Sequence, residues 1–392
     1  MRQYLKYLKG DSVVWIISVL MLTFSLVTVY SFVPILIKIE GGSPFNYLYK
    51  HFIYVLLAFL SMYWVHTRNP KYVFKLAKFI YVIAVLLLIF TMFFGLKVND
   101  AGRWIRIPNA GRWIRIPFIN LTFQSSDFAK LALIIYLSRL LDAKKAVLNQ
   151  WKEGVLPLML PIVIVCGLIV KDNFSTAAIL FSISLALLFV GRVQLKKIGV
   201  IIASVVFALF LVIIIHKAIP SLNLLPRYQT WENRWLNHDG ESVITNAQAL
   251  NARLAIHNGS LLGQGVGDGE LKEFIPEAYA DFYYASFVEE FGLISAFFLI
   301  LLYLILLFRI FKIGLNTDNL FQTYVCVGIG MLILSQASVN MLVCTGVFPV
   351  TGQNMPLLAM GGSALIMVSV SIGLVQSIGR SNKSQLEDIN KF

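Results

Sequence analysis

The chain has 392 residues, of which 58% are hydrophobic and only 14% are charged, and its mean hydropathy is +0.76. Soluble globular proteins carry about 25% charged residues, so this composition excludes that class and predicts an integral membrane protein. The formal net charge of +13 fits basic cytoplasmic segments facing anionic lipid and does not indicate nucleic-acid binding. Cys166, Cys326 and Cys344 fall in apolar stretches and form neither a disulfide framework nor a metal-binding pattern.

Ten apolar stretches predict an all-α fold of about ten transmembrane helices, because a span takes about 20 mostly apolar residues. The stretches are 13–36, 49–65, 77–96, 128–141, 155–170, 174–191, 198–215, 283–308, 319–345 and 357–378. Lys and Arg are enriched in cytoplasmic segments. With a cytoplasmic N-terminus, more than half of the 33 Lys and Arg residues lie inside. We therefore expect one polytopic domain, 1–392, with both termini and a short tail, 379–392, in the cytoplasm.

The first unusual outer loop runs from residue 96 to residue 127 and carries five basic residues on the side where positive charge is normally depleted. It contains an eight-residue repeat, Ala101–Pro108 followed by Ala110–Pro117. Arg binds phosphate oxygens in a bidentate way, and Trp favours the headgroup layer. The loop is therefore either an interfacial anchor or a site for an anionic headgroup or diphosphate.

The second outer loop, 216–282, is far longer than a connection requires and contains eight of the twenty acidic residues. Its aromatic residues and the apolar run 256–262 favour an ordered loop. The glycine-rich segment 263–269 could bind phosphate through backbone amides, but no Lys-Ser or Lys-Thr follows it. Turns are the favoured interpretation of this segment.

Two carboxylates, Glu277 and Asp281, stand where this loop enters the long apolar segment 283–308, whose only acids are Glu289 and Glu290. An ionisable residue at the edge of the hydrocarbon is costly unless it is paired with an opposite charge, solvated by water or required for function. These acids are therefore candidates for function.

Several polar residues are predicted within or at the ends of the spans. Asp127 and Lys130 are three apart and share a helix face, so they either neutralise each other or contact substrate. Asn173 suits a helix N-cap. Gln336 and Asn340 could form hydrogen bonds between helices. Pro and Gly residues between 349 and 362 predict a break in helical structure, which at membrane depth must be buried in protein or line a cavity.

The motifs, taken in order, resemble those of the SEDS family, the polytopic RodA and FtsW proteins of bacterial cell elongation and division. The matching segments are Gly111–Arg115, Phe123–Lys130, Asn173–Ala177, Pro276–Glu277 with Asp281–Phe282, Glu289–Gly292, Gln336 with Asn340, and Pro349–Gly352 through Pro356 to Gly361–Ser363.

The resemblance implies a peptidoglycan glycosyltransferase that polymerises lipid II at the outer face of the cytoplasmic membrane, with a polyprenyl diphosphate as leaving group. It assigns the catalytic role to Asp281, as general base or as ligand of a divalent cation, Mg²⁺ or Mn²⁺, with no organic cofactor. The implied supporting residues are Glu277, Glu289, Asp127 and Lys130. The implied substrate-binding residues are Arg112, Trp113, Arg115, Gln124, Gln353 and Ser363.

This chain departs from the family pattern at a few positions. Gln124-Ser-Ser-Asp127 replaces Gln-Pro-Ser-Glu, Tyr279 and Ala280 replace polar residues, and Asn173 replaces an acid. The repeat is not a family feature. Its second copy keeps the number of residues that separates this motif from Gln124 in the family, so the substrate-binding role is assigned to the second copy.

The residues of the segment Val350–Pro356 and the short tail resemble FtsW more than RodA, which favours a role at the division site. The implied partners are a class B penicillin-binding protein, lipid II and other division or elongation membrane proteins. Three alternatives stay open: a RodA-type polymerase for elongation, a lipid II flippase or secondary transporter, and a scaffold without catalysis. No convincing inverted repeat supports transport.

Overall fold

The structure, a computed structural model, describes residues 8–94, 96–97, 111–116, 121–170, 172–219, 243–275 and 277–389. Its elements in chain order are α1 (Ser12–Glu40), α2 (Pro44–His66), α3 (Pro70–Phe94), β1 (Leu96–Lys97), β2 (Gly111–Ile116), β3 (Leu121–Gln124), α4 (Ser125–Ala143), η2 (Trp151–Val155), α5 (Leu156–Val170), α6 (Phe174–Val190), α7 (Leu195–Ala218), α9 (Val243–Gly259), η4 (Leu271–Phe274), α10 (Tyr283–Leu315), α11 (Leu320–Cys344) and α12 (Gly362–Ile389).

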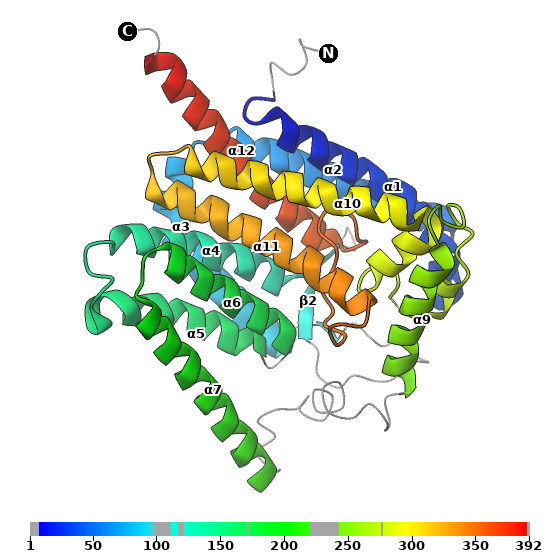
Figure 1. The fold of residues 1–392 in the computed structure, drawn as a ribbon, viewed down its shortest axis with the longest axis horizontal. Coiled ribbons are helices and arrows are strands. Elements are labelled where there is room, and N and C mark those ends of the chain that lie inside the picture. The colour runs from blue at the N-terminus through cyan, green and yellow to red at the C-terminus, as the bar shows by residue number, and fades with distance from the viewer. Residues whose placement is uncertain are drawn as a thin grey trace.

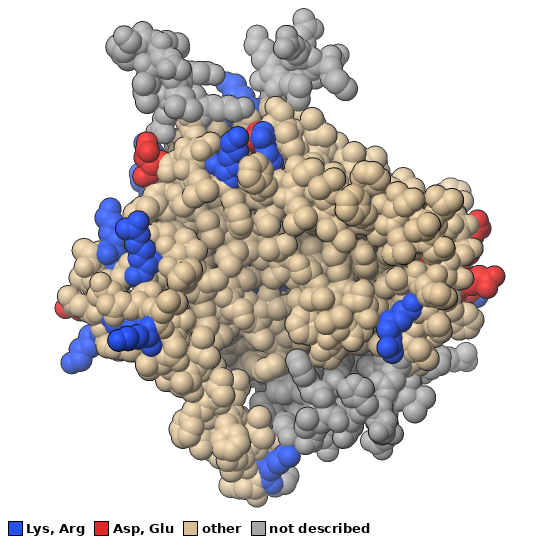
Figure 2. All heavy atoms as spheres, in the orientation of Figure 1, with Lys and Arg blue, Asp and Glu red and all other residues tan. Residues whose placement is uncertain are grey.

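The predicted helical membrane fold is confirmed. Eight helices in the described part of the chain are long and apolar enough to cross a membrane, and they coincide with eight of the predicted spans. The other two predicted spans, 128–141 and 174–191, coincide with α4, which carries several charges, and with the shorter apolar α6. In Figure 2 the middle of the face drawn is almost free of charged side chains among the described residues.

Two side-by-side groups of helices form the bundle (Figure 1). One hydrophobic cluster joins α1, α2, α10, α11 and α12, and a second joins α3, α4, α5 and α6. Residues of α3, α4 and α11 belong to both clusters, so these three helices connect the two groups. The helix α7 leans away from the bundle, and most of its apolar surface is exposed.

The beginning of α1 and the cytoplasmic end predicted for α12 lie at the same end of the bundle. Asp11 pairs with Arg309 near the end of α10 at 2.7 Å, and its N–H donates to Gln376 of α12 at 2.8 Å. These contacts place the start of α10, where Asp281 precedes Tyr283, at the opposite end of the bundle from Asp11 and Gln376.

The predicted start of the tenth span was wrong. Residues 357–361 are not helical, and α12 begins only at Gly362, because Leu357 has a φ of 66° and follows Pro356. The predicted tail, 379–392, is helical over most of its length, because α12 continues to Ile389. The helix extends beyond the apolar stretch because no proline stands there to end it.

A small antiparallel sheet, absent from the all-α prediction, lies in the first outer loop. Its strand order is β1-β2-β3, and Trp113 pairs with Gln124 at the point where β3 runs directly into α4. The second copy of the repeat therefore forms an ordered strand. The first copy, 101–108, lies outside the described residues.

The helix α10 is interrupted at Gly292, which has a φ of 78°. The backbone groups freed there are paired by the segment 260–265. The Leu293 N–H donates to Ser260 O at 2.9 Å, and the Gln264 N–H donates to Glu289 O at 2.9 Å. A break of this kind is stable near the membrane because its backbone groups find partners within the protein. The glycine-rich segment thus builds turns that close this break, and its amides at 264 and 265 are already used.

The break gives a stability prediction. A Cβ at Gly292 would lie 2.4 Å from Leu261 O, and the φ of Gly292 is in the left-handed region. Gly292→Ala should therefore lower the free energy of unfolding by at least about 1–2 kcal/mol, measured as an earlier thermal transition of the purified protein. The matched control is Gly167→Ala in α5, where a Cβ meets nothing within 4 Å. It should be neutral or stabilising. Equal transitions for the two variants would contradict the account.

Candidate active site

The carboxylate of Asp281 stands at the mouth of the bundle, in a tight turn just before α10. The N–H groups of Ala280 and Asp281 both donate to Glu277 O, at 2.9 and 3.0 Å, and Glu277 has a φ of 57°. Phe282 is buried and anchors the turn in the core, whereas Asp281 is half-buried and Glu277 is exposed. The turn therefore holds Asp281 between protein and solvent, with Glu277 further out.

A fully buried amide on α11 fixes the backbone of this turn. The Asn340 side chain donates through Nδ2 to Asp281 O at 2.9 Å and to Gln353 O at 2.8 Å. Its Oδ1 accepts from the Tyr284 N–H at 3.3 Å. One side chain thus joins the Asp281 turn, the start of α10 and the segment 349–361. The predicted hydrogen bonding of Asn340 between helices is confirmed.

The segment 349–361 is the predicted helix break, and it runs beside the carboxylate. A Cβ added at Gly352 would lie 3.5 Å from Asp281 Oδ2. Gln353 is buried, and its Nε2 donates to Thr176 Oγ1 at 2.7 Å. Asn173 caps α6 by accepting from the Thr176 N–H at 3.0 Å, as predicted. Gln353 therefore ties the segment to the outer end of α6.

The predicted pair of Asp127 and Lys130 is present on α4, with 2.8 Å between Oδ1 and Nζ. Ser363, at the start of α12, donates to Asp127 Oδ2 at 2.9 Å. All three side chains are buried. The structure thus brings together three predicted site residues, and their contacts with one another join α4 to α12.

The two acids of α10 have separate structural roles. Glu289 is fully buried and accepts from the N–H groups of Leu271 and Lys272, at 2.9 and 3.1 Å, and so caps η4. Glu290 is paired with Lys272, and Ser31 of α1 hydrogen-bonds both of them. Lys272 Nζ also donates to Gly267 O at 3.1 Å. These contacts fix the polypeptide that leads to the Asp281 turn.

The buried pair makes a second stability prediction. Lys272→Met leaves Glu290 without its counter-charge and should cost about 3–5 kcal/mol. The double variant Lys272→Met with Glu290→Leu should recover much of that loss. The matched control is Lys38→Met, which breaks the exposed pair of Lys38 with Glu273 and should cost about 0–1 kcal/mol. Thermal unfolding of the purified proteins measures the loss of stability in the Lys272→Met, double and Lys38→Met variants. An equal loss for the Lys38 and Lys272 variants would contradict the prediction.

The predicted substrate-binding residues of the first outer loop lie on the small sheet. Arg112, Trp113 and Arg115 are on β2, and Gln124 ends β3 next to α4. The side chains of the β2 residues lie outside the described part of the structure. The sheet thus places this loop at the outer end of α4, the end that carries Asp127.

No group of three or more His, Cys, Asp or Glu side chains in the described residues could hold a metal ion. Mg²⁺ is commonly held by one or two carboxylates together with substrate phosphates, and one carboxylate beside a diphosphate fits that pattern.

The comparison with known families decides the classification. A family model described as a cell cycle protein and covering FtsW, RodA and SpoVE matches residues 11–384. The chain belongs to this family. The predicted resemblance is thereby confirmed.

Curated relatives in the FtsW, RodA and SpoVE family match nearly the whole chain. A protein of Coxiella burnetii named "Probable peptidoglycan glycosyltransferase FtsW" is 31% identical over 376 residues, covering 94% of this chain and 95% of that protein. A protein of Geobacter sp. strain M18 with the same name is 27% identical, covering 94% and 96%. Both relatives carry the FtsW name, which confirms the predicted likeness to FtsW.

Solved structures of the family share the fold. One chain of a complex described under "Structural coordination of polymerization and crosslinking by a peptidoglycan synthase complex" has a TM-score of 0.72 and 24% identity, covering 95% of this chain and 98% of that chain. The rod shape determining protein RodA of Thermus thermophilus has a TM-score of 0.65 and 21% identity, covering 95% and 97%. These two structural matches show that this chain has the fold of those solved structures.

Two contributions to the site of this family member were missed by sequence reasoning. Lys272 was not singled out, although a basic residue nine positions before Asp281 is a possible partner for the acids of α10. Thr176 was included only within the family segment Asn173–Ala177, and it accepts the hydrogen bond of Gln353. The residues of the Gln353 contact are 177 apart and those of the Lys272 pair are 18 apart, and neither spacing lies within one helical turn, so no local pattern predicts them.

Proposed function

We propose that this protein is a peptidoglycan glycosyltransferase that polymerises lipid II into glycan strands at the outer face of the cytoplasmic membrane, in cell division. The observation that carries the proposal is the half-buried carboxylate of Asp281, which Asn340 and the segment 349–361 fix at the end of the bundle opposite the termini. The FtsW names of its curated relatives support the same activity.

The reaction requires a base near the attacking hydroxyl. A sugar hydroxyl of the acceptor attacks the anomeric carbon of the donor, and its proton passes to the Asp281 carboxylate. The bond between the anomeric carbon and the diphosphate oxygen breaks, and its electron pair leaves with the polyprenyl diphosphate. One glycosidic bond forms for each diphosphate released. The basic residues of β2, with Arg112 preferred, are proposed to stabilise the charge of the leaving diphosphate.

The divalent cation is a separate part of the proposal. In the alternative role, Asp281 would not act as the base but, with the diphosphate of the substrate, would hold Mg²⁺ or Mn²⁺, which would supply positive charge near the leaving group. A general base contributes about 10²–10⁴ in rate by itself. The assignment of Asp281 therefore does not depend on the ion.

The protein is a multi-pass membrane protein, and its partner is inferred from the fold. The related chain of known structure comes from a peptidoglycan synthase complex. We propose that a class B penicillin-binding protein binds this chain and cross-links the strands that it makes.

Reconstitution tests the function. The purified protein, with its transpeptidase partner and a divalent cation, should convert lipid II in proteoliposomes into glycan strands that form a ladder on a denaturing gel. Movement of lipid II between leaflets without polymer would support a flippase instead. A fluorescent fusion should gather at midcell, whereas uniform labelling of the side wall would favour a RodA-type role in elongation.

A further inference from the structure

The segment 349–361 also supports the Asp281 turn through its last residues. The Met360 N–H donates to Tyr279 O at 3.0 Å, and Tyr279 lies two residues before Asp281 in the same turn. This hydrogen bond joins the end of the segment to the turn. A shift of residues 358–360 would therefore be passed on to the carboxylate.

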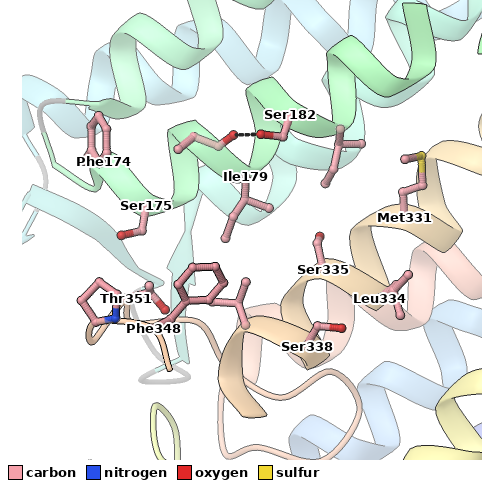
Figure 3. A pocket seen from close by; sticks show the side chains of 14 residues that line it. Phe174, Ser175, Ile179, Ser182, Met331, Leu334, Ser335, Ser338, Phe348 and Thr351 are labelled. Carbon is pink, nitrogen blue, oxygen red and sulfur yellow. Dashed lines mark hydrogen bonds between the residues drawn. The ribbon is translucent and has the colours of Figure 1, made fainter. Parts of the chain in front are cut away.

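The beginning of the segment borders an open space. Pro349 and Thr351 line a cavity of about 470 Å³ between α6 and α11 (Figure 3). The buried Oγ1 of Thr351 has no hydrogen-bond partner among the described residues. Further along, Leu357 has a φ of 66°, and a residue other than glycine keeps such a conformation only where its surroundings hold it. The segment therefore needs contacts near its end to keep its position.

A buried pair of side chains from α1 and α2 holds the carbonyl of Leu358. Ser25 of α1 donates through Oγ to Leu358 O at 2.7 Å. His51 of α2 contacts the same hydroxyl, with 2.9 Å between its Nε2 and Ser25 Oγ. Both side chains are buried. Among the described residues, Ser25 is the only hydrogen-bond partner of this imidazole.

The hydrogen bonds of Ser25 fix the tautomer of His51. A serine hydroxyl has one proton, and Ser25 gives it to Leu358 O, so the hydroxyl can only accept from the imidazole. Nε2 must therefore carry a proton. Nδ1 is buried without a hydrogen-bond partner in the part of the chain that the structure describes. A neutral imidazole with its proton on Nε2 completes this chain of hydrogen bonds without a buried charge.

The packing of α2 keeps His51 close to the segment. Tyr54, about one turn further along α2, packs against the start of α12, because a Cβ added at Gly362 would lie 2.2 Å from its ring. Gly362 comes four residues after Leu358. The two helices therefore approach each other closely just beyond the carbonyl that Ser25 holds.

We infer that His51 is a positioning residue that holds the Asp281 turn for glycosyl transfer. It donates to Ser25, and Ser25 holds the carbonyl of Leu358. The N–H of Met360 then transmits this position to the turn. The inference rests on the proposed function. The buried amide of α11 fixes the turn directly, and the route through α1 and α2 fixes it a second time.

A pair of amide variants tests the role of Nε2. Gln places its amide nitrogen near the position of Nε2 and can still donate to Ser25, whereas Asn reaches only to the position of Nδ1. A displacement of about 1 Å of a catalytic group can cost about 10²-fold in rate, and a shift transmitted through two hydrogen bonds should cost less. We expect His51→Asn to lower kcat for polymerisation about tenfold with little change in KM, and His51→Gln to stay within about threefold of wild type.

Ser25→Ala breaks the same chain of hydrogen bonds and should give a similar loss of kcat even if His51→Asn does not fold. The double variant should be no worse than either single variant, because both changes remove one path. The matched controls are Ser18→Ala, on a buried serine of α1, and His66→Asn, on a buried histidine at the end of α2. Both should keep the wild-type kcat, because neither side chain forms a hydrogen bond with the segment 349–361.

Hydrogen exchange measures the support of the turn without relying on catalysis. In the full-length protein in nanodiscs, the backbone amides of 279–281 and 358–361 should exchange faster in His51→Asn and Ser25→Ala than in wild type. The same amides should stay protected in His51→Gln. Nitrogen NMR of the protein with labelled histidine rings, assigned by the His51→Gln variant, should show a proton on Nε2 and none on Nδ1.

Three results would overturn the inference. One is a folded His51→Asn protein with the kcat and the exchange rates of wild type. Another is an equal loss in the Asn and Gln variants, because packing of the ring would then explain both. The third is a proton on Nδ1 of His51 in place of Nε2. If the wild-type protein made no polymer while the exchange rates changed as expected, the support of the turn would stand and only the proposed polymerase function would be contradicted.

Discussion

Replacing Asp281 with Asn is expected to reduce glycan polymerisation by about 10²–10⁴, because the amide cannot accept the proton of the attacking hydroxyl. The structure places this carboxylate half-buried beside Gly352, in a turn whose backbone other residues fix. Asn has nearly the same shape as Asp, so the fold should be kept. The change should therefore appear in kcat, measured from strand formation by the reconstituted protein.

The matched control for Asp281→Asn is Glu270→Gln, the same change of acid to amide on an exposed residue of the same outer loop. Its rate should stay within about twofold of wild type, as expected for a surface residue outside the reacting groups. Full polymerisation by Asp281→Asn, in protein shown by gel filtration to be folded, would remove the catalytic assignment.

Replacing Asn340 with Ala is expected to cost both rate and stability. Asn340 is fully buried, and its amide serves Asp281 O, Gln353 O and the Tyr284 N–H. Buried polar groups left without partners cost about 1–3 kcal/mol. A displacement of about 1 Å of a catalytic group can cost about 10²-fold in rate. We expect a loss of that order in kcat, with a smaller change in KM.

Thr345→Ala is the control for Asn340→Ala, because it removes a polar group from the same helix end, where the exposed hydroxyl donates to the carbonyl of Leu342. It should leave kcat and the thermal transition close to wild type. A folded Asn340→Ala protein with wild-type kcat would show that the amide does not position Asp281.

The features that the sequence predicted correctly depend on local patterns. Asp127 and Lys130 are three residues apart on one helix, so their pairing follows from helical geometry. The cap by Asn173 is also local. The break before α12 follows from its Pro and Gly residues, but the helix begins only at Gly362, five residues after the predicted start at residue 357.

The features that were missed depend on contacts between distant segments. The interruption of α10 at Gly292 exists because the segment 260–265 pairs with the freed backbone groups. The cap that Glu289 places on η4 was not predicted, although Glu289 itself was expected as a supporting residue. The apolar run after Asp281 gives no sign of either contact, because hydropathy reports burial and not the identity of the partner.

The central claim is that this chain couples formation of a glycosidic bond to release of a polyprenyl diphosphate at Asp281. The most direct measurement counts both products in one reconstituted reaction on lipid II, for wild type and for Asp281→Asn. We predict one diphosphate released for each glycosidic bond in wild type, and neither product above background in the variant. Diphosphate release without strands, or equal strand formation by both proteins, would contradict the account.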